Sequence, residues 1–403
     1  MYKIILKLAF KNAFLRLART ILVIVMIAVS MSMMLSIQGL YDGMTFSMAD
    51  KIKRSDCGDI SLYSKNYRIT RAIKDDISDA TAIQKELLKN GDVDAVVLRL
   101  KAEGLSSTAR KSAFSVIVGI DLNEEEKFGQ FSRFLKQGEI RLGKRDVLLG
   151  SELAKKLKVK IGSKVIFSTQ DSTGEINGIS LRVRGIVETN NILLDKSALF
   201  VDKTRLQKFL GVSKEEATQI AIRTNSQTLL KQLQARYPHL DVKSFLELYP
   251  IIQQMQDLMF IFNSLSFLIV MLVVFIGIMG VMYVSILDRI REFGIMRSIG
   301  MGYSLIRSQI FLEAFFVGFV GYIIGAFLGF FALKYLQNYG LDLSEFADGL
   351  ASFGYSSTLY ATIKFSYFSS TFIAIMAASF LSVLLPLRKI KNMNTIEVTK
   401  ANI

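Results

Sequence analysis

The sequence predicts an α-helical membrane protein with four transmembrane helices and a large mixed α/β domain outside the membrane. The chain has 403 residues, 51% of them hydrophobic, and this apolar content is clustered. A helix needs about 20 apolar residues to cross a bilayer. Four segments meet that length: residues 21–40, 258–287, 310–333 and 365–387. Residues 41–257 have the composition of an ordinary soluble domain, with charges throughout.

The charges beside these spans predict the topology. Residues 1–20, the loop 288–309 and the tail 388–403 are rich in Lys and Arg, whereas the loop 334–364 is acidic at its centre. Short basic loops stay in the cytoplasm. We therefore expect both termini and the loop 288–309 in the cytoplasm, and residues 41–257 and the loop 334–364 on the outer side of the membrane.

The first twenty residues are predicted to form a cytoplasmic amphipathic helix. Lys3, Lys7 and Lys11 recur every four residues and leave apolar side chains on the other faces. Such a helix lies on the inner membrane surface. The basic region is too long, and the following apolar run too wide, for a cleaved signal peptide.

The outer domain shows alternating strand and helix patterns. The first helix should continue out of the membrane and break near Gly58. Strands are expected at 114–120, 147–149, 164–168, 180–187, 198–201 and 219–223. Helices are expected at 78–90, 151–157, 203–210, 226–237 and 241–257, the last one running into the second span. This pattern favours a mixed α/β domain, with one or two lobes.

Several functions are disfavoured by composition. Cys57 is the only cysteine and His239 the only histidine, so an intrachain disulfide is excluded and a histidine-containing zinc site is disfavoured. We expect no catalytic, cofactor or metal site in this chain. The net charge of +15 comes without any nucleic-acid-binding pattern, so nucleic acid is not expected as a partner. The pairs Asp75–Asp76 and Glu124–Glu126 are interpreted as surface carboxylates.

One stretch imitates a phosphate-binding loop. Gly138, Gly143 and Lys144 have its spacing, but Arg145 stands where Ser or Thr must hold Mg²⁺. No strongly apolar strand precedes it. We interpret it as a turn, so ATP and Mg²⁺ would be bound by a partner.

The residues directly after the second span form a polar segment with helical periodicity. Ile290, Phe293, Ile295, Met296 and Ile299 recur at spacings of three and four and predict one apolar stripe. The charged side chains of Arg289, Glu292 and Arg297 lie largely off this stripe, and Gly300 can end the helix. A short amphipathic helix across the end of a span leaves one face free for a partner.

The run Glu-Phe-Gly-Ile-Met-Arg-Ser-Ile-Gly from Glu292 to Gly300 resembles the signature of FtsX-like ABC transporter permeases. This family includes the MacB and LolC/LolE proteins. The resemblance implies that the segment is a coupling helix that docks on a separate ATPase. The residues implied in coupling are Arg289, Arg291, Glu292, Phe293, Gly294, Ile295, Met296, Arg297 and Gly300. Residues 147–165 also resemble a stretch of the family's outer domain, which we interpret as core.

The third span contains one ionisable residue and a row of glycines. Glu313 should face protein or water, because a charge within a bilayer costs a few kcal/mol. We expect it to act in structure or coupling, paired with a basic residue of the coupling helix. The small residues Gly318, Gly321, Gly325 and Gly329 predict close helix packing.

These features predict the permease subunit of an ABC transporter that works by mechanotransmission. The arrangement is most similar to LolC/LolE, which implies lipoprotein release from the inner membrane. The implied partners are a LolD-like ATPase, a second permease copy or paralogue, membrane lipids, a lipoprotein substrate and a periplasmic carrier. Met26, Met31, Met33 and Met34 either offer a surface for acyl chains or pack between helices.

Three alternatives stay open at this point. The chain could serve MacB-like efflux or peptide export, although it carries no attached ATPase, or it could be an FtsX-like regulator of cell-wall hydrolases. From a different class, it could be a membrane sensor without an ATPase.

Overall fold

The computed structural model divides into two compact units. It describes residues 6, 9–11, 17–189, 191–226, 228–346, 349 and 357–391. The helical unit comprises Met1–Met44, Gln256–Leu343 and Thr358–Ile403, and the sheet unit comprises Thr45–Met255 and Ser344–Ser357. The predicted amphipathic helix 1–20 and the tail 388–403 lie largely outside the described residues.

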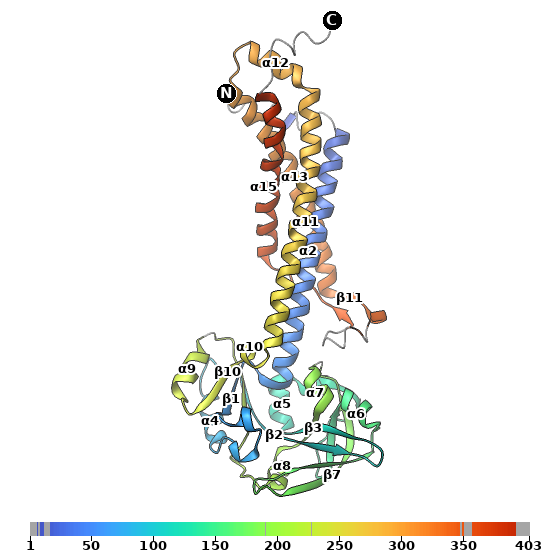
Figure 1. Cartoon of the computed structure of the whole chain (residues 1–403), viewed down its shortest axis with the longest axis vertical. Coiled ribbons are helices and arrows are strands. Elements are labelled where there is room, and N and C mark those ends of the chain that lie inside the picture. Colours follow the sequence, from blue (N-terminus) through green and yellow to red (C-terminus); the bar gives the residue numbers. More distant parts are fainter. Residues whose placement is uncertain are drawn as a thin grey trace. The chain divides into compact units, whose positions relative to one another are not determined.

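Four long helices build the helical unit (Figure 1). They are α2 (Leu17–Ile52), α11 (Pro250–Asp288), α13 (Tyr303–Asn338) and α15 (Phe365–Lys391). Each is long and apolar enough to cross a membrane, which confirms the predicted class. All four extend beyond the predicted apolar runs, because a helix satisfies its own backbone hydrogen bonds and can continue past the bilayer.

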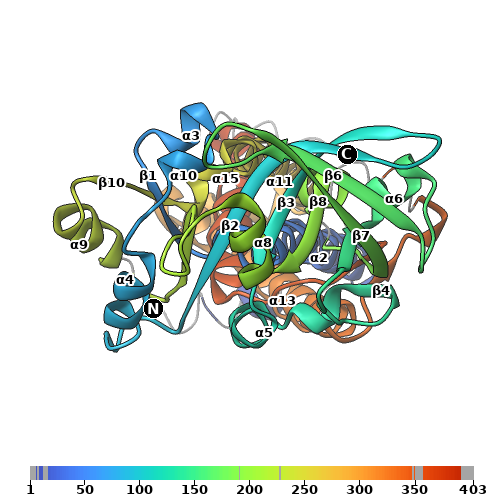
Figure 2. The same cartoon turned by 90° about the horizontal axis from the view of Figure 1, so that it is seen from below.

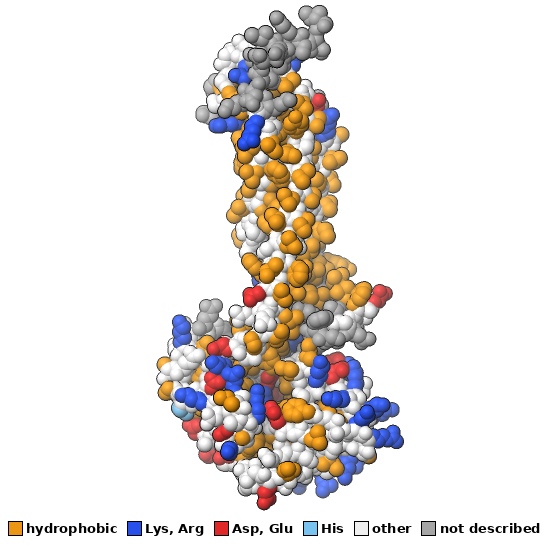
Figure 3. Space-filling view, viewed as in Figure 1, with side chains coloured by type: hydrophobic (Ala, Val, Ile, Leu, Met, Phe, Trp, Pro, Cys, Tyr) orange, Lys and Arg blue, Asp and Glu red, His pale blue; other side chains and the backbone are white. Residues whose placement is uncertain are grey.

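Apolar side chains cover the visible surface of this unit (Figure 3). On α11, for example, Phe260, Ile269 and Ile276 are all more than half exposed. A helix that is apolar all round is stable in lipid or against other helices and not in water. The interior is formed by side chains from all four helices, including Ile27, Leu35, Ile278, Ile310 and Val383.

A small hairpin follows α13. The strands β11 (Leu341–Asp342) and β12 (Thr358–Leu359) pair in antiparallel fashion. Beyond β12, the Thr362 amide donates to the Gly39 carbonyl at 2.9 Å and connects this segment to α2. The short 3-10 turn η4 (Ser344–Phe346) lies between the two strands in sequence and belongs to the sheet unit.

The sheet unit is built on ten strands (Figures 1 and 2). They are β1 (Ile60–Ser64), β2 (Ala95–Ser107), β3 (Ser112–Ile120), β4 (Leu135–Gly138), β5 (Asp146–Gly150), β6 (Lys164–Gln170), β7 (Ile176–Val187), β8 (Ala198–Asp202), β9 (Gln219–Arg223) and β10 (Leu240–Ser244). The order is β10-β1-β9-β2-β3-β8-β5-β7-β4, and β6 pairs with β2 and β7. The β3–β8 and β5–β7 pairs are parallel, and the others are antiparallel.

Short helices pack against this sheet. They are α3 (Tyr67–Thr70), α4 (Ala80–Leu87), α5 (Leu122–Gly129), α6 (Ser151–Leu157), α7 (Ile192–Ser197), α8 (Lys203–Leu210), α9 (Leu229–Arg236) and α10 (Phe245–Leu248), with the 3-10 turns η2 (Ile73–Asp75) and η3 (Phe131–Phe134). One core joins α4 and α9 to the β1, β9 and β10 end of the sheet, and another joins α6 and α8 to β5, β6 and β7. A third core joins α7 and η3 to β3, β5 and β8. The mixed α/β prediction is therefore confirmed, with several cores on a continuous sheet.

The regular helix α2 ends where the sequence predicts a break. The helix passes at Ile52 into a π-turn, η1 (Lys53–Cys57), which ends at Gly58 with φ 64°. A Cβ atom at Gly58 would lie 2.3 Å from the Ile222 carbonyl oxygen. Only glycine combines this left-handed backbone with so close an approach.

One predicted helix is wrong. Residues 241–257 were expected to be helical throughout, but Leu240–Ser244 form β10, which pairs with β1. Leu240 and Val242 are buried on alternate positions, so the strand pattern prevails there. Ser244 then caps α10 with a capping box to Glu247, and α11 begins at Pro250. The pattern analysis also missed β1, β2, β4, α3, α5 and α7.

Candidate functional site

The predicted coupling segment is a separate helix at one end of the helical unit. It is α12 (Ile290–Ser298), preceded by a break at Arg289 and followed by Gly300 in the left-handed region with φ 90°. Phe293 and Gly294 are buried, and Phe293 belongs to the core of the helical unit. Ile295 and Ile299 are 51% and 77% exposed. The expected single apolar stripe is thus divided between an anchored face and an exposed face.

The anchored side of α12 is held by a buried ion pair. The Arg289 guanidinium donates from Nη1 to both carboxylate oxygens of Glu313 on α13, at 3.0 and 3.1 Å. Both residues are at least 90% buried, and Gln309 also donates to Glu313 at 3.2 Å. A buried charge is stable only when it is paired and hydrogen-bonded, so α12 and α13 are held in one register.

The exposed side of α12 carries the remaining predicted coupling residues. Glu292 accepts a hydrogen bond from Arg289 Nε at 3.0 Å but is itself largely exposed. Arg291 is exposed, whereas Met296 and Arg297 are half-buried. Together with Ile295 and Ile299, these residues offer an apolar surface edged by charge. Gln309 is a member of the anchoring cluster that sequence reasoning did not single out.

A second ion pair connects the base of α2 with the end of α11. Arg19 Nη1 lies 2.6 Å from Asp288 Oδ2, one residue before Arg289. Both side chains are partly exposed, so this contact contributes little stability by itself. It does bring the start of α2 close to the break between α11 and α12.

The glycine row of α13 lies against two neighbouring helices. A Cβ atom at Gly321, Gly325 or Gly329 would meet α2 at Ile27, Ala28 and Leu35, within 2.5–3.0 Å. At Gly318 it would lie 2.2 Å from the Ser379 hydroxyl on α15. The absence of side chains lets these helix backbones approach closely.

Replacing Gly325 with Leu should separate α13 from α2. The new side chain would overlap the Ala28 backbone and Met31, and overpacking of this kind costs about 1–3 kcal/mol. We expect a lower thermal unfolding midpoint in detergent, followed by circular dichroism. Gly280→Leu on α11 is the matched control, because a Cβ atom there meets nothing within 4 Å. An equal loss in both variants would contradict the packing role.

The methionines of the first span mostly pack between helices. Met31 and Met34 are buried, and Met26 lies where a Cβ atom on Gly277 would touch its sulfur. Met33 is 61% exposed. Of the four, only Met33 therefore has a side chain open to an acyl chain in this structure.

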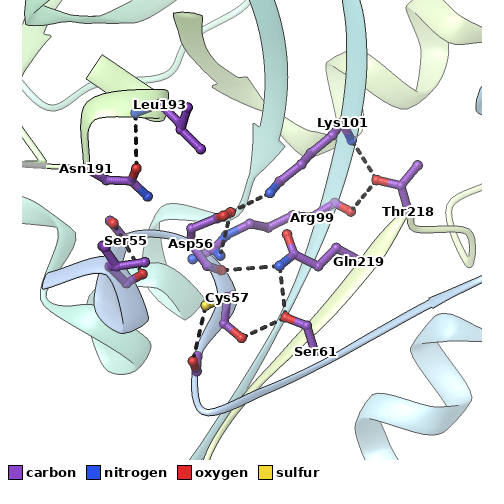
Figure 4. Close-up of polar contacts among 12 residues, drawn as sticks. Ser55, Asp56, Cys57, Ser61, Arg99, Lys101, Asn191, Leu193, Thr218 and Gln219 are labelled. Atoms are coloured by element: carbon purple, nitrogen blue, oxygen red, sulfur yellow. Dashed lines mark hydrogen bonds and ion pairs between the residues drawn. The ribbon is translucent and has the colours of Figure 1, made fainter. Parts of the chain in front are cut away.

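A buried network of charges lies inside the sheet unit (Figure 4). On β2, Arg99 makes a two-pronged ion pair with Glu125 of α5, at 2.5 and 2.7 Å, and both side chains are 2% exposed. Lys101, also on β2, contacts the carboxylate of Asp56 in η1. The second oxygen of Asp56 accepts from the Tyr249 hydroxyl. Two cations thus balance two carboxylates.

Neutral side chains complete this network. Gln219 donates to the Ser61 hydroxyl at 3.0 Å and to the Asp56 carbonyl at 3.4 Å, as Figure 4 shows. Asn191 donates to the Tyr249 hydroxyl at 3.1 Å. Arg99 Nη1 lies 4.0 Å from Asp56 and makes no hydrogen bond among the described residues. Asp56 lies just after α2 and Tyr249 just before α11, so the segments that follow α2 and precede α11 contact the same group of charges.

Sequence patterns did not indicate this network, because its members come from six separate segments. The loop resembling a phosphate-binding motif is a different matter. Gly138 ends the edge strand β4, and Lys144 and Arg145 form a turn before β5. No helix of the P-loop type follows Lys144, which agrees with the interpretation as a turn.

The structure places Asp76 beside a carboxylate other than that of its sequence neighbour Asp75. The Ile77 amide donates to the Ala217 carbonyl at 2.8 Å, which brings Asp76 beside Glu216. Burial, together with the charge of Glu216, raises the pKa of Asp76 to about 7. Asp75 contributes less to this shift than Glu216 does.

The raised pKa predicts that Asp76 opposes folding at neutral pH. An unfolded Asp loses its proton near pH 4, whereas the folded group holds it to about 7, so the folded state binds more protons in between. Stability should therefore fall as the pH rises through this window. Asp76→Asn should raise the thermal unfolding midpoint at about pH 8 and leave it unchanged near pH 4. An equal shift at both pH values would contradict the assignment.

Comparisons with known proteins give the family. The model of the MacB-like periplasmic core domain matches residues 20–239, more than half of the chain, and the model of the FtsX-like permease C-terminal region matches residues 264–395. The chain belongs to the FtsX/MacB-type family of ABC transporter permeases. Permeases of this family work with an ABC ATPase partner. The second match covers α12, α13, α15 and the part of α11 from residue 264 onward.

Several solved domains are similar to part of this permease. The periplasmic region of MacB from Actinobacillus actinomycetemcomitans is 17% identical, with a TM-score of 0.33, over 48% of this chain and 92% of that one. The extracellular domain of the ABC-type transporter YknZ from Gram-positive bacteria is 15% identical, with a TM-score of 0.32, over 46% and 98%. A domain of a putative permease protein from Porphyromonas gingivalis is 15% identical, with a TM-score of 0.27, over 46% and 88%. No curated protein sequence matches the chain.

Proposed function

We propose that this permease is worked by a separate ABC ATPase that docks on α12 at the cytoplasmic face of a bacterial inner membrane. The observation that supports it is the division of α12 into two faces. Phe293 and Arg289 fix one face to the helical unit, while Ile295 and Ile299 stay exposed on the other. Exposed isoleucines edged by charge fit a protein contact, with an apolar centre and a polar rim.

In this proposal the helices transmit movement and do not enclose a polar path. A push on α12 reaches α13 through Arg289 and Glu313, and reaches α2 through Asp288 and Arg19. The 39 residues of α11 form a rod about 58 Å long, at about 1.5 Å per residue. Both termini are cytoplasmic, from the basic flanks of the spans. A second permease copy or a paralogue would cover part of the exposed apolar surface of α11.

The substrate that we propose is a lipoprotein released from the inner membrane to a periplasmic carrier. The similarity of the span arrangement to LolC/LolE supports this choice, and so does the exposed Met33. The partner ATPase would then be LolD-like and would bind ATP and Mg²⁺. MacB-like export and FtsX-like control of cell-wall hydrolases remain the competing functions, and a sensor without an ATPase is the competing class.

Site-specific crosslinking tests the docking face. A photoreactive residue at Ile295 or Ile299 should capture an ABC ATPase in cells, identified by mass spectrometry. Ile276 on α11 is the control, because it is equally exposed but lies in the middle of a predicted span and should reach lipid or another permease. Crosslinks from Ile295 and Ile299 to lipid alone would favour the sensor and reject the proposal.

Depletion of this permease in cells tests which class of substrate it carries. Loss of the chain should trap lipoproteins in the inner membrane, seen by fractionation and quantitative mass spectrometry. Unaltered lipoprotein sorting would reject the lipoprotein substrate and favour export or hydrolase control, while leaving the docking of an ATPase intact.

A further inference from the structure

One end of the sheet unit carries a dense group of cations that the proposed function does not use. We call it the basic face: Lys164 on β6, Arg182 and Arg184 on β7, and Arg141, Lys144 and Arg145 in the loop before β5. All six are exposed. Figure 3 shows Lys and Arg side chains crowded along the side of the unit where Figure 1 labels α6.

The strand register places these cations next to one another. Lys164 and Arg182 are direct cross-strand partners in the antiparallel β6–β7 pair. Side chains at such positions lie about 5 Å apart on one face, and like charges there are destabilising. Arg184 is two residues from Arg182 and alternates onto the same face, and the Arg182 amide donates to the Arg145 carbonyl at 2.7 Å.

Few carboxylates neutralise the group. Asp146 accepts from Arg184 Nε at 2.8 Å and lies 3.9 Å from Arg141, and the exposed Glu139 lies in the same loop. Within the described part of the chain, no carboxylate lies within ion-pair distance of Lys144, Arg145, Lys164 or Arg182. The fold thus holds like charges without carboxylate partners close together on strands and turns. Their repulsion costs free energy, and an external anion would remove that cost.

We propose that the basic face binds an acidic surface on a partner protein. Four of the six cations are arginines, whose planar guanidinium pairs with a carboxylate in two-pronged fashion and which are enriched in protein interfaces, where lysines are depleted. The exposed Ile161 and Ile166 flank the cations, and Ile166 shares a face of β6 with Lys164. Exposed isoleucines among arginines fit a protein–protein interface, which has an apolar centre and a polar rim.

Two other polyanions fit these features less well. Attraction to an anionic membrane needs only a mobile polybasic segment, whereas these cations are fixed by strands and tight turns. A single-stranded nucleic acid would need aromatic side chains for stacking, and none belongs to the basic face. The inference concerns the sheet unit alone and does not depend on an ATPase docking on α12.

Binding of a polycarboxylate to the full chain tests the proposal. The chain would be held in nanodiscs of phosphatidylcholine, and a fluorescent poly-L-glutamate peptide would be titrated by anisotropy. We expect binding that weakens as salt is raised, because exposed charges are screened. The triple variant Arg145→Glu, Lys164→Glu and Arg182→Glu should weaken it by about tenfold or more.

A matched variant separates the basic face from net charge. Lys85→Glu, Lys89→Glu and Lys231→Glu change the same number of exposed charges on other elements and should weaken binding by less than about twofold. A triple variant with Gln at positions Arg145, Lys164 and Arg182 controls for misfolding. Its circular dichroism spectrum should be unchanged. Equal losses in the two Glu triples would overturn the proposal. Basic-face-dependent flotation with phosphatidylglycerol vesicles, without poly-L-glutamate binding, would overturn it in favour of a lipid surface.

Discussion

Replacing Glu313 with Gln should uncouple the permease from its ATPase. The substitution removes the carboxylate whose two oxygens both accept from Arg289 Nη1, and leaves a guanidinium buried without its main counter-charge. Breaking a buried pair in this way costs about 3–5 kcal/mol, and about 1.4 kcal/mol already corresponds to tenfold in an equilibrium. The anchored position of α12 should therefore be depopulated, and substrate-stimulated ATPase activity in reconstituted complexes should fall by about tenfold or more.

Glu152→Gln on α6 is the control for this prediction. It removes a carboxylate that is 45% exposed and pairs with Lys155 at 2.6 Å, and Glu152 is not among the predicted coupling residues. We expect less than about a twofold change, because exposed pairs contribute about 0–1 kcal/mol. The replacement of both Arg289 and Glu313 by Met should be less harmful than either single loss. Wild-type coupling in Glu313→Gln would remove this pair from the transmission path.

The second large effect is expected in the sheet unit, where Glu125→Gln should loosen the sheet around β2. The change leaves Arg99 buried with only the distant carboxylate of Asp56, at 4.0 Å. We expect a loss of about 3–5 kcal/mol in the stability of this unit. Hydrogen exchange followed by mass spectrometry on the full chain should show faster exchange across β2 and η1, because Asp56 shares the network.

The exposed pair of Lys136 and Glu188 provides the comparison. Both side chains are about 40% exposed, so Glu188→Gln should change stability by less than about 1 kcal/mol. Faster exchange in β2 without any change near η1 would show that Arg99 and Asp56 act separately. Unchanged exchange in both segments would contradict the clamp role of the network.

The family signature and the spans could be read from local patterns. Long apolar runs are visible in any window of the sequence, and the run from Glu292 to Gly300 directly follows one of them. Amphipathic periodicity also predicted α6 and α8 with the bounds that the structure has. These features depend on neighbours along the chain, so sequence alone determines them.

Other features needed the tertiary structure. The segment 241–257 has helix-like apolar spacing at Leu246 and Leu248, and only the pairing of β10 with β1 selects the extended form of Leu240–Ser244. The sequence indicated that Glu313 needs a basic partner. The identity of that partner depends on the break between α11 and α12, which places Arg289 beside Glu313. The side chain of Ile295 turned outward because Phe293 occupies the core.

The sequence by itself determined the membrane class, the position of the short helix α12 and the family, because hydropathy and short motifs are local properties. The tertiary structure decided which charges meet: Arg289 with Glu313, Arg99 with Glu125, and Lys164 beside Arg182. Long-range pairing depends on strand register and helix crossing, and a shift of one residue in a strand moves a side chain to the other face. That information lies in the packing of the whole chain and in no single segment.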